Sequence, residues 1–444
     1  MAYIPHTDAD RSAMLAAIGA ASVDELFEGI PEGVRLKGPL SLPAHSEFEV
    51  ERYFEERAAE NRVYRPGRLF LGAGAYQHYT PAAVLHLVQR GEFMTCYTPY
   101  QAEVSQGTLQ VIFEFQSHIC ALTGMEVANA SLYDGATALC EAIAMAVRHT
   151  RQNVVYVPEL LLPAYREVCE AQLVGLDVEL RTIPAVGART DFAGVSDAGK
   201  AAAVVVATPN RLGGIEDGAE ARALATRLGG LLIACVNPTS LAILAAPGDY
   251  GADIAVGEAQ PLGIPLSFGG PYAGFFSCRR ELIRKMPGRI VGRTKDAQGR
   301  DGFVLTLQAR EQHIRRDKAT SNICTNQGLF AALATMYMTF VGREGLAEVA
   351  ETSLLRTQQL AARLTANAPV GRFDPMTPHF HEVALRLPIP AMRFLGAMRE
   401  RGFLAGFDLA RWGYDPNLLL VNCTELMTER DIDEYVDAAR AILT

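Results

Sequence analysis

The sequence predicts an α/β protein with three parts: a large domain built on a doubly wound, mostly parallel sheet, a smaller C-terminal α+β domain, and a helical N-terminal arm. Short apolar runs rich in alanine and β-branched residues recur through the middle of the chain, and each stops close to a proline or glycine. Helical stretches separate these runs, and this alternation is typical of β-α-β units. Continuous apolar runs favour strands that are covered on both faces, as in a parallel sheet.

Residues 1–68 are predicted to form the arm. Thr7, Ser22 and Ser46 each stand three residues before an acidic residue and just ahead of apolar residues, which is typical of helix N-caps. Proline and glycine separate the resulting short helices. Because helices this short gain little stability alone, we expect the arm to pack against something larger.

The other two parts are predicted to be a large domain over 69–315 and a small domain over 316–444. The carboxyl ends of parallel strands meet at one edge of a sheet, and this edge is where open α/β sheets bind ligands. In the large domain we expect strands over 154–157, 201–206, 231–236 and 252–256, and a helix over 219–228. In the small domain we expect helices over 329–340 and 429–443, and strands over 382–387 and 418–421.

Composition excludes several classes of protein. The chain has 444 residues, 49% of them hydrophobic, so it can bury a large core; its formal charge of −9 argues against a basic nucleic-acid binder. Eight cysteines without a C-x-x-C pair predict reduced thiols, and nine histidines without ligand spacing predict no metal site. The sequence shows no signal peptide and no apolar stretch long enough to span a membrane, so we expect a cytoplasmic protein.

Three polar segments of the large domain are candidates for a binding site. The first contains a Gly-x-Gly turn, the second gathers hydroxyl groups around a proline, and the third leads into an alanine-rich helix whose free N–H groups suit a phosphate. A structural explanation stays open for each: a tight loop, simple packing, and a helix capped by Asp134. The segments are 72–81, 95–107 and 131–142.

Residues 279–318 form a basic segment. It holds twelve Lys or Arg and five Asp or Glu, so its charge is +7 and the remainder carries −16 (−9 − 7). Such a segment suits an acidic partner or an anionic ligand. Pairing with acidic residues of the same chain is an equally good explanation.

These motifs resemble the glycine cleavage system P-protein family over 71–81, 97–107, 131–138, 269–276 and 308–325. The resemblance implies a pyridoxal phosphate (PLP) enzyme of fold type I, the aspartate-aminotransferase type. It implies a glycine decarboxylase that releases CO2 and transfers the aminomethyl group to lipoamide on an H-protein. Length and motifs resemble the alpha subunit of the two-subunit bacterial form, whose partner is a beta subunit in a heterodimer or α2β2 heterotetramer.

The chain lacks both groups with which this fold holds PLP. Lysine is the covalent anchor and should follow the strand over 252–256, but the sequence there reads Gly-Glu-Ala-Gln, with Gln260 near the expected position. The strand over 231–236, which should present an aspartate to the pyridine nitrogen, offers no carboxylate. We therefore expect the beta subunit to hold PLP covalently and the isolated chain to be inactive. Only five of the 41 basic residues are lysines: Lys37, Lys200, Lys285, Lys295 and Lys318.

The resemblance also implies that this chain contributes to a site near the subunit interface, with no catalytic residue of its own. Since the H-protein is acidic in this family, the basic segment is a candidate docking surface, represented by Arg289 and Arg293. The interface candidates are His78, Tyr97, Tyr100, Thr320, Ser321 and Asn322.

Two other interpretations stay open at this point. One is a self-contained PLP enzyme such as an aminotransferase, which the missing lysine argues against. The other is a catalytically silent scaffold or regulatory homologue of a PLP enzyme, in which the loops have only an architectural role.

Overall fold

The structure is a computed structural model that describes residues 5–38, 40–196, 199–319, 321–323 and 325–444. The chain divides into two compact units, Met1–Val63 and Tyr64–Thr444. The predicted division of the second unit at residue 315 stays a prediction.

The first unit contains two capped helices, α1 (Asp8–Ile18) and α2 (Glu47–Ala59). Thr7 and Ser46 form capping boxes with Asp10 and Glu49, which confirms two of the predicted N-caps. At the third, the hydroxyl of Ser22 accepts from the backbone N–H of Glu25, but the chain forms only a short 3-10 helix, Asp24–Phe27. None of the described residues of this unit is buried.

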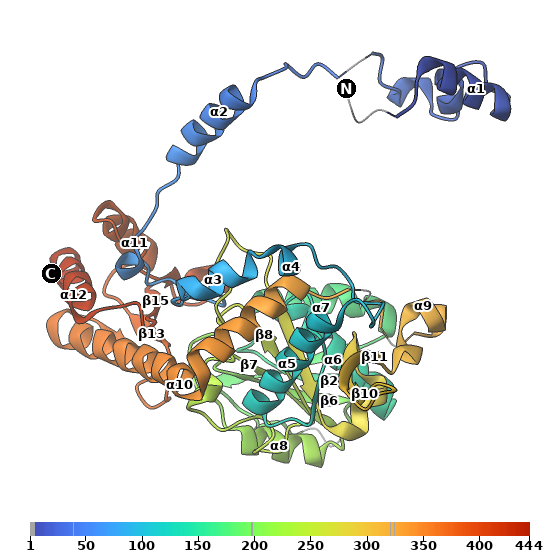
Figure 1. Cartoon of the computed structure of the whole chain (residues 1–444). Coiled ribbons are helices and arrows are strands. Elements are labelled where there is room, and N and C mark those ends of the chain that lie inside the picture. The colour runs from blue at the N-terminus through green and yellow to red at the C-terminus, as the bar shows by residue number, and fades with distance from the viewer. Residues whose placement is uncertain (1–4, 39, 197–198, 320, 324) are drawn as a thin grey trace. The chain divides into compact units, whose positions relative to one another are not determined.

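The second unit is built around a seven-stranded sheet (Figure 1). The five strands β8, β7, β6, β2 and β3 run parallel. Beyond β8, β9 pairs antiparallel with β8, and β1 pairs antiparallel with β9 at the edge of the sheet. The strands, in spatial order, are β1 (Val127–Ala128), β9 (Gly274–Cys278), β8 (Ile254–Glu258), β7 (Leu231–Val236), β6 (Ala203–Thr208), β2 (Val154–Pro158) and β3 (Glu179–Ile183).

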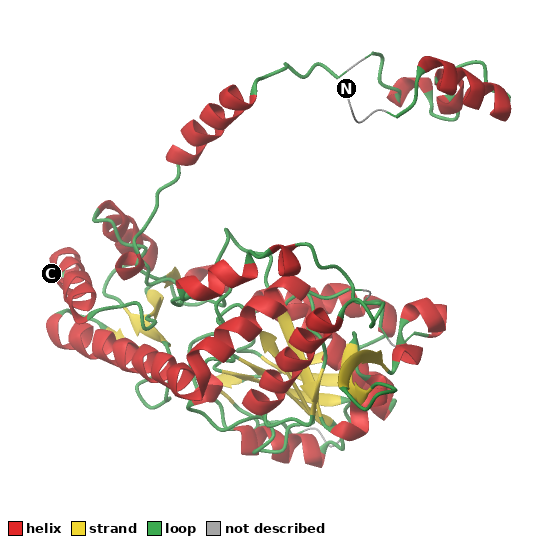
Figure 2. Cartoon of the chain, viewed as in Figure 1, coloured by secondary structure: helices red, strands yellow, loops and turns green. Residues whose placement is uncertain are grey.

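Helices cover both faces of this sheet (Figure 2). Along β6, Val204 and Val206 pack into one core cluster with α5, α8 and α10, whereas Val205 packs into the other with α6 and α7. This alternation is the period of two expected for a strand that is buried on both faces. The helices are α3 (Ala82–Val88), α4 (Gly91–Met94), α5 (Gln106–Thr123), α6 (Gly135–Thr150), α7 (Pro163–Leu173), α8 (Gly218–Arg227) and α9 (Gln312–Arg315).

Two of the predicted strands begin and end two residues later than the apolar pattern indicated. The apolar runs over 201–206 and 252–256 predicted strands that end with the last β-branched residue, yet β6 continues to Thr208 and β8 to Glu258. The reason is the ladder: Thr208 pairs with Val236, and Glu258 pairs with Gly274 of β9. Backbone pairing therefore extends both strands beyond their apolar runs, so that each strand ends in a polar residue.

The C-terminal part forms a second, antiparallel sheet with its own core, and α10 connects it to the large sheet. The long helix α10 (Gly328–Asn367) is interrupted at Gly342, whose φ of 65° lies in the left-handed region that favours glycine. Pairing joins the strands in the order β12 (Gly371–Arg372), β13 (Glu382–Arg386), β15 (Leu418–Asn422) and β14 (Phe407–Asp408), with helices α11 (Ala391–Glu400) and α12 (Glu429–Leu443) packed beside them.

Two short hairpins complete the fold. They are β4 (Ala185–Val186) with β5 (Arg189–Thr190), and β10 (Ile290–Lys295) with β11 (Asp301–Thr306). Of the helices formed by described residues, none is both long enough and apolar enough to cross a membrane.

Candidate functional site

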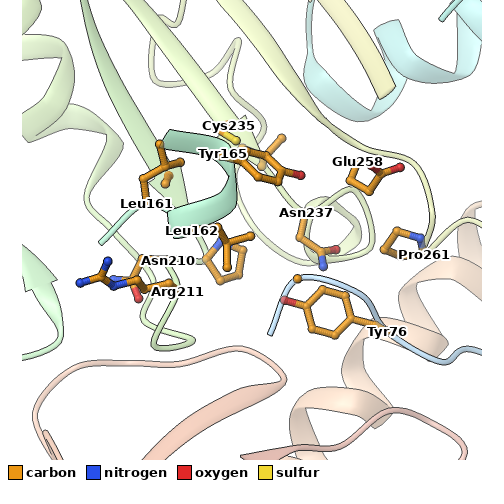
Figure 3. A pocket seen from close by; sticks show the side chains of 14 residues that line it. Tyr76, Leu161, Leu162, Tyr165, Asn210, Arg211, Cys235, Asn237, Glu258 and Pro261 are labelled. Atoms are coloured by element: carbon orange, nitrogen blue, oxygen red, sulfur yellow. The ribbon is translucent and has the colours of Figure 1, made fainter. Parts of the chain in front are cut away.

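A small pocket lies at the carboxyl ends of the central parallel strands, as the sequence predicts for an open α/β sheet (Figure 3). Its volume is about 60 Å³. Pockets that take cofactor-sized ligands enclose roughly 300–1,000 Å³. The lining residues are Gly74, Tyr76, Leu161, Leu162, Tyr165, Ala207, Pro209, Asn210, Arg211, Cys235, Val236, Asn237, Glu258 and Pro261. The pocket is therefore too small for PLP.

Glu258 is the acidic group of this pocket. Its carboxyl oxygens accept hydrogen bonds from three backbone N–H groups: Gly135 at 3.0 Å, and Gln260 and Ala273 at 3.2 Å each. Burial raises its pKa to about 8, and the nearby Asp134 acts in the same direction, while the three N–H groups oppose the shift. Burial and Asp134 thus disfavour the charged form of this carboxyl group, whereas its three N–H donors favour that form.

The end of β7 offers no carboxylate to the pocket. Cys235, Val236 and Asn237 line it at this point, and burial raises the pKa of the Cys235 thiol to about 12. The Asn237 side chain accepts from the backbone N–H of Thr239 and lies 3.4 Å from the ring of His381. The end of β7 therefore has no carboxylate that could pair with the pyridine nitrogen of PLP.

The position expected for the lysine is filled by a structural glutamine. Gln260 is buried, accepts from the N–H of Tyr76 at 2.9 Å, and donates to the carbonyls of Tyr76 and Ile264. All five lysines are described, and none of them lines the pocket. With no amine, no carboxylate on β7 and too little space, the residues present do not fit covalently held PLP.

A buried polar network beside the pocket escaped the sequence analysis. Glu382 accepts from the hydroxyl of Tyr76 at 2.7 Å and from the N–H of Ala73 at 2.6 Å, and burial raises its pKa to about 7. The ring of His381 contacts the ring of Tyr76 in a tilted arrangement, with centroids 4.2 Å apart, and burial lowers the pKa of His381. A sequence signal was present, since Glu382 stands directly before three apolar residues of the same strand, but nothing indicated its partners 306 to 309 residues away.

The structure places the candidate His78 inside the chain. Its side chain is only 2% exposed, and Nδ1 lies 2.7 Å from a carboxylate oxygen of Glu425. The pKa of Glu425 is lowered by His78 in spite of burial. Direct contact between His78 and another chain is therefore difficult without rearrangement.

The two candidate tyrosines lie at the surface. Tyr97 is 83% exposed and Tyr100 is 54% exposed. The Tyr100 hydroxyl accepts from the guanidinium of Arg289 at 3.0 Å, and this guanidinium also lies over the Tyr100 ring. Exposed aromatic side chains close together are typical of surfaces that bind a partner.

Of the three neighbouring candidates, Thr320 lies outside the described residues. Ser321 is half-buried and accepts from the N–H of Ile323, whereas Asn322 is exposed. A hydrogen bond from Ser321 lowers the pKa of Glu141, although burial of that carboxyl group raises it more strongly.

Much of the basic segment is paired within the chain. Arg289 is 4% exposed and lies 3.9 Å from Glu311, so it is no free surface charge. Arg293 is exposed but pairs with Asp301 of the neighbouring strand. Exposed basic side chains for which the described residues provide no ion pair follow at Arg315, Arg316 and Lys318.

The comparisons with known proteins agree over the whole chain. The family model described as glycine cleavage system P-protein matches residues 1–438. A protein named probable glycine dehydrogenase (decarboxylating) subunit 1, from Moorella thermoacetica, is 50% identical over 450 residues, covering all of both chains.

Solved structures give the same result. A crystal structure of glycine decarboxylase (P-protein) of the glycine cleavage system, in inhibitor-bound form, matches with a TM-score of 0.90 and 44% identity, covering all of both chains. A sphingosine-1-phosphate lyase from Burkholderia pseudomallei shares the fold at a TM-score of 0.65 and 15% identity, covering 92% of this chain and 94% of that one. The fold is that of PLP-dependent enzymes of fold type I, as the sequence predicted. The chain belongs to the glycine cleavage system P-protein family.

Proposed function

We propose that this chain is the alpha subunit, or subunit 1, of a heteromeric glycine decarboxylase, and that a beta subunit holds PLP covalently. The complex decarboxylates glycine and transfers the aminomethyl group to lipoamide of an H-protein, in the cytoplasm, as a heterodimer or α2β2 heterotetramer. Full-length similarity to proteins named subunit 1 supports this assignment. The observation that carries the division of labour is Gln260, which is buried where the fold's lysine would stand.

The contribution of this chain to the shared site comes from exposed polar loops. Tyr97, Tyr100 and Asn322 present hydroxyl and amide groups at the surface, and Ser321 is partly accessible beside them. Hydroxyl and amide groups of this kind orient a carboxylate or a phosphate by hydrogen bonds. His78 acts, in this proposal, from inside the chain by fixing the polar segment that follows Gly72-Ala73-Gly74.

Mixing the two purified subunits tests the proposal. The alpha chain alone, incubated with PLP and then separated from unbound PLP by gel filtration, should give no absorbance band in the range of roughly 390–420 nm expected for a lysine-bound cofactor. Glycine-dependent CO2 exchange should appear only when both chains are present. A band or activity in the alpha chain alone would show that it is a self-contained enzyme.

Single substitutions distinguish two roles for this chain: one in which its exposed loops contribute to the shared active site, and one in which it is a catalytically silent scaffold. Tyr97→Phe or Tyr100→Phe should lower exchange activity roughly tenfold, a barrier increase of about 1.4 kcal/mol, while assembly is unchanged. Tyr79→Phe is the matched control, because Tyr79 is also an exposed tyrosine but is not a candidate. Equal activity of all three variants would favour the scaffold.

A further inference from the structure

The N-terminus of α6 has the features of an anion site. The first backbone N–H groups of a helix have no partner within it, and the helix dipole adds positive potential there. This combination commonly binds phosphate. The sequence left two possibilities for this segment, a phosphate site or a helix capped by Asp134.

The chain fills this helix end with two of its own carboxyl groups. The carboxylate of Asp134 accepts from the N–H of Thr137 at 2.7 Å and completes a capping box. A carboxyl oxygen of Glu258 accepts from the N–H of Gly135 at 3.0 Å. Glu258 comes from β8, so this second cap is a tertiary contact, made across 123 residues of sequence.

Glu258 is held firmly in this position. Its other carboxyl oxygen accepts from the N–H groups of Gln260 and Ala273, one on each side of the turn that joins β8 to β9. Three backbone donors from three separate segments thus converge on one side chain. This number of donors is what a bound phosphate or carboxylate oxygen group would receive.

Little space is left around the helix end. A Cβ atom built on Gly135 would lie 2.2 Å from the hydroxyl of Tyr165 and 2.9 Å from the backbone nitrogen of Glu258. Glu258 and Tyr165 both border the pocket (Figure 3). An additional ligand group therefore meets side chains of the chain itself before it reaches the N–H groups.

We infer that the Glu258 carboxyl group occupies the place at the N-terminus of α6 where a phosphate would otherwise bind, and so closes this chain's pocket to phosphate-bearing ligands. The pocket therefore lacks a lysine, and in addition the Glu258 carboxyl group closes it. This goes beyond the proposed function, because it concerns the alpha chain's own pocket and holds whichever partner the chain assembles with.

Chemical rescue of a truncated side chain tests the inference. In the full-length chain, Glu258→Ala removes the carboxyl group and leaves three N–H groups around an opening. We expect a melting temperature several degrees lower, which inorganic phosphate restores in a saturable manner while potassium chloride at equal ionic strength does not. In the wild-type chain the Glu258 carboxyl group already occupies this place, so phosphate should not raise the melting temperature to a comparable extent.

Glu382→Ala is the matched control, because it also removes a buried carboxyl group that accepts a backbone N–H, but its donors, Ala73 and Tyr76, belong to a loop and to no helix. Phosphate should not restore this variant. If Glu258→Ala does not fold, Glu258→Ser is measured in the same way, since it keeps a small polar group. Absence of rescue, equal rescue of the control, or equal stabilisation of the wild type by phosphate would each overturn the inference.

Discussion

Glu258 and Glu382 are two buried carboxyl groups whose pKa values lie above the usual range, at about 8 and about 7. Neither has a basic side chain among the hydrogen-bond partners identified for it; backbone N–H groups bind Glu258, and Ala73 and Tyr76 bind Glu382. Burial disfavours the charged form and raises both pKa values. A group whose pKa is higher in the folded state stabilises fully below its unfolded pKa, and this stabilisation is lost as pH rises through the folded value.

Replacing Glu382 with glutamine should make this loss visible. The amide keeps an oxygen for the N–H of Ala73 and can donate to the Tyr76 hydroxyl, but it does not titrate. From pH 4.5 to 7 the wild type should lose stability relative to Glu382→Gln, up to ~3 kcal/mol at and above pH 7. Urea unfolding across this range measures the difference. Parallel curves for the two proteins would contradict the pKa assigned to Glu382.

At the scale of single elements, the strands and the arm differ in how they reach stability. The central strands are buried on both faces, so their apolar runs made them predictable from sequence. In contrast, α1 and α2 have good N-caps, but their apolar side chains are exposed in the structure. On α2, Val50, Tyr53 and Phe54 form one apolar stripe at helical spacing.

We expect the α2 stripe to bind the partner subunit. The double variant Val50→Ser/Phe54→Ser should weaken association of the two subunits, measured by sedimentation, and leave the melting temperature of the chain nearly unchanged, because neither side chain is buried. Glu55→Ser, at an exposed position on the opposite side of the same helix, is the control. A large fall in the melting temperature with normal association would instead show that the stripe stabilises the chain itself.

For the whole molecule, the arrangement of charge suggests where an acidic partner binds. Arg289 is buried and Arg293 is paired, so the proposed docking of the H-protein falls mainly on the exposed end of the basic segment, at Arg315, Arg316 and Lys318. Charged surfaces mainly set the rate and the salt dependence of association.

Charge reversal tests this docking surface in the assembled complex. Arg293→Glu and Arg315→Glu should each weaken H-protein binding about two- to fivefold at low salt, as expected for exposed charge pairs, and should reduce the dependence on salt. Arg393→Glu on α11 provides the matched control, because it reverses an exposed arginine that lies outside the basic segment. Unchanged affinity and an unchanged salt slope would exclude the segment as the docking site.

The sequence predicted much of the fold and part of the site, for identifiable reasons. The resemblance implied where a lysine and an aspartate would be needed, and the predicted strands showed that both are missing. In the structure Asn237 directly follows β7, and Gln260 lies two residues after β8. The sequence analysis missed Glu258 as a cap because its donors, Gly135, Gln260 and Ala273, meet only in the folded chain. His78 was proposed as an interface residue because it lies in a polar loop, and its contact with Glu425, 347 positions away, became visible only in the folded chain.

By itself, the sequence determined the parallel α/β core, the helix caps and the absence of a lysine after β8, because these depend on residues close together along the chain. The tertiary structure decided which polar groups are buried, how large the pocket is, and that α6 is capped twice. These properties depend on distant segments that share one small volume, and on the removal of water from it. Only in the folded chain does the carboxyl group of Glu258, the last residue of β8, lie at the N-terminus of α6.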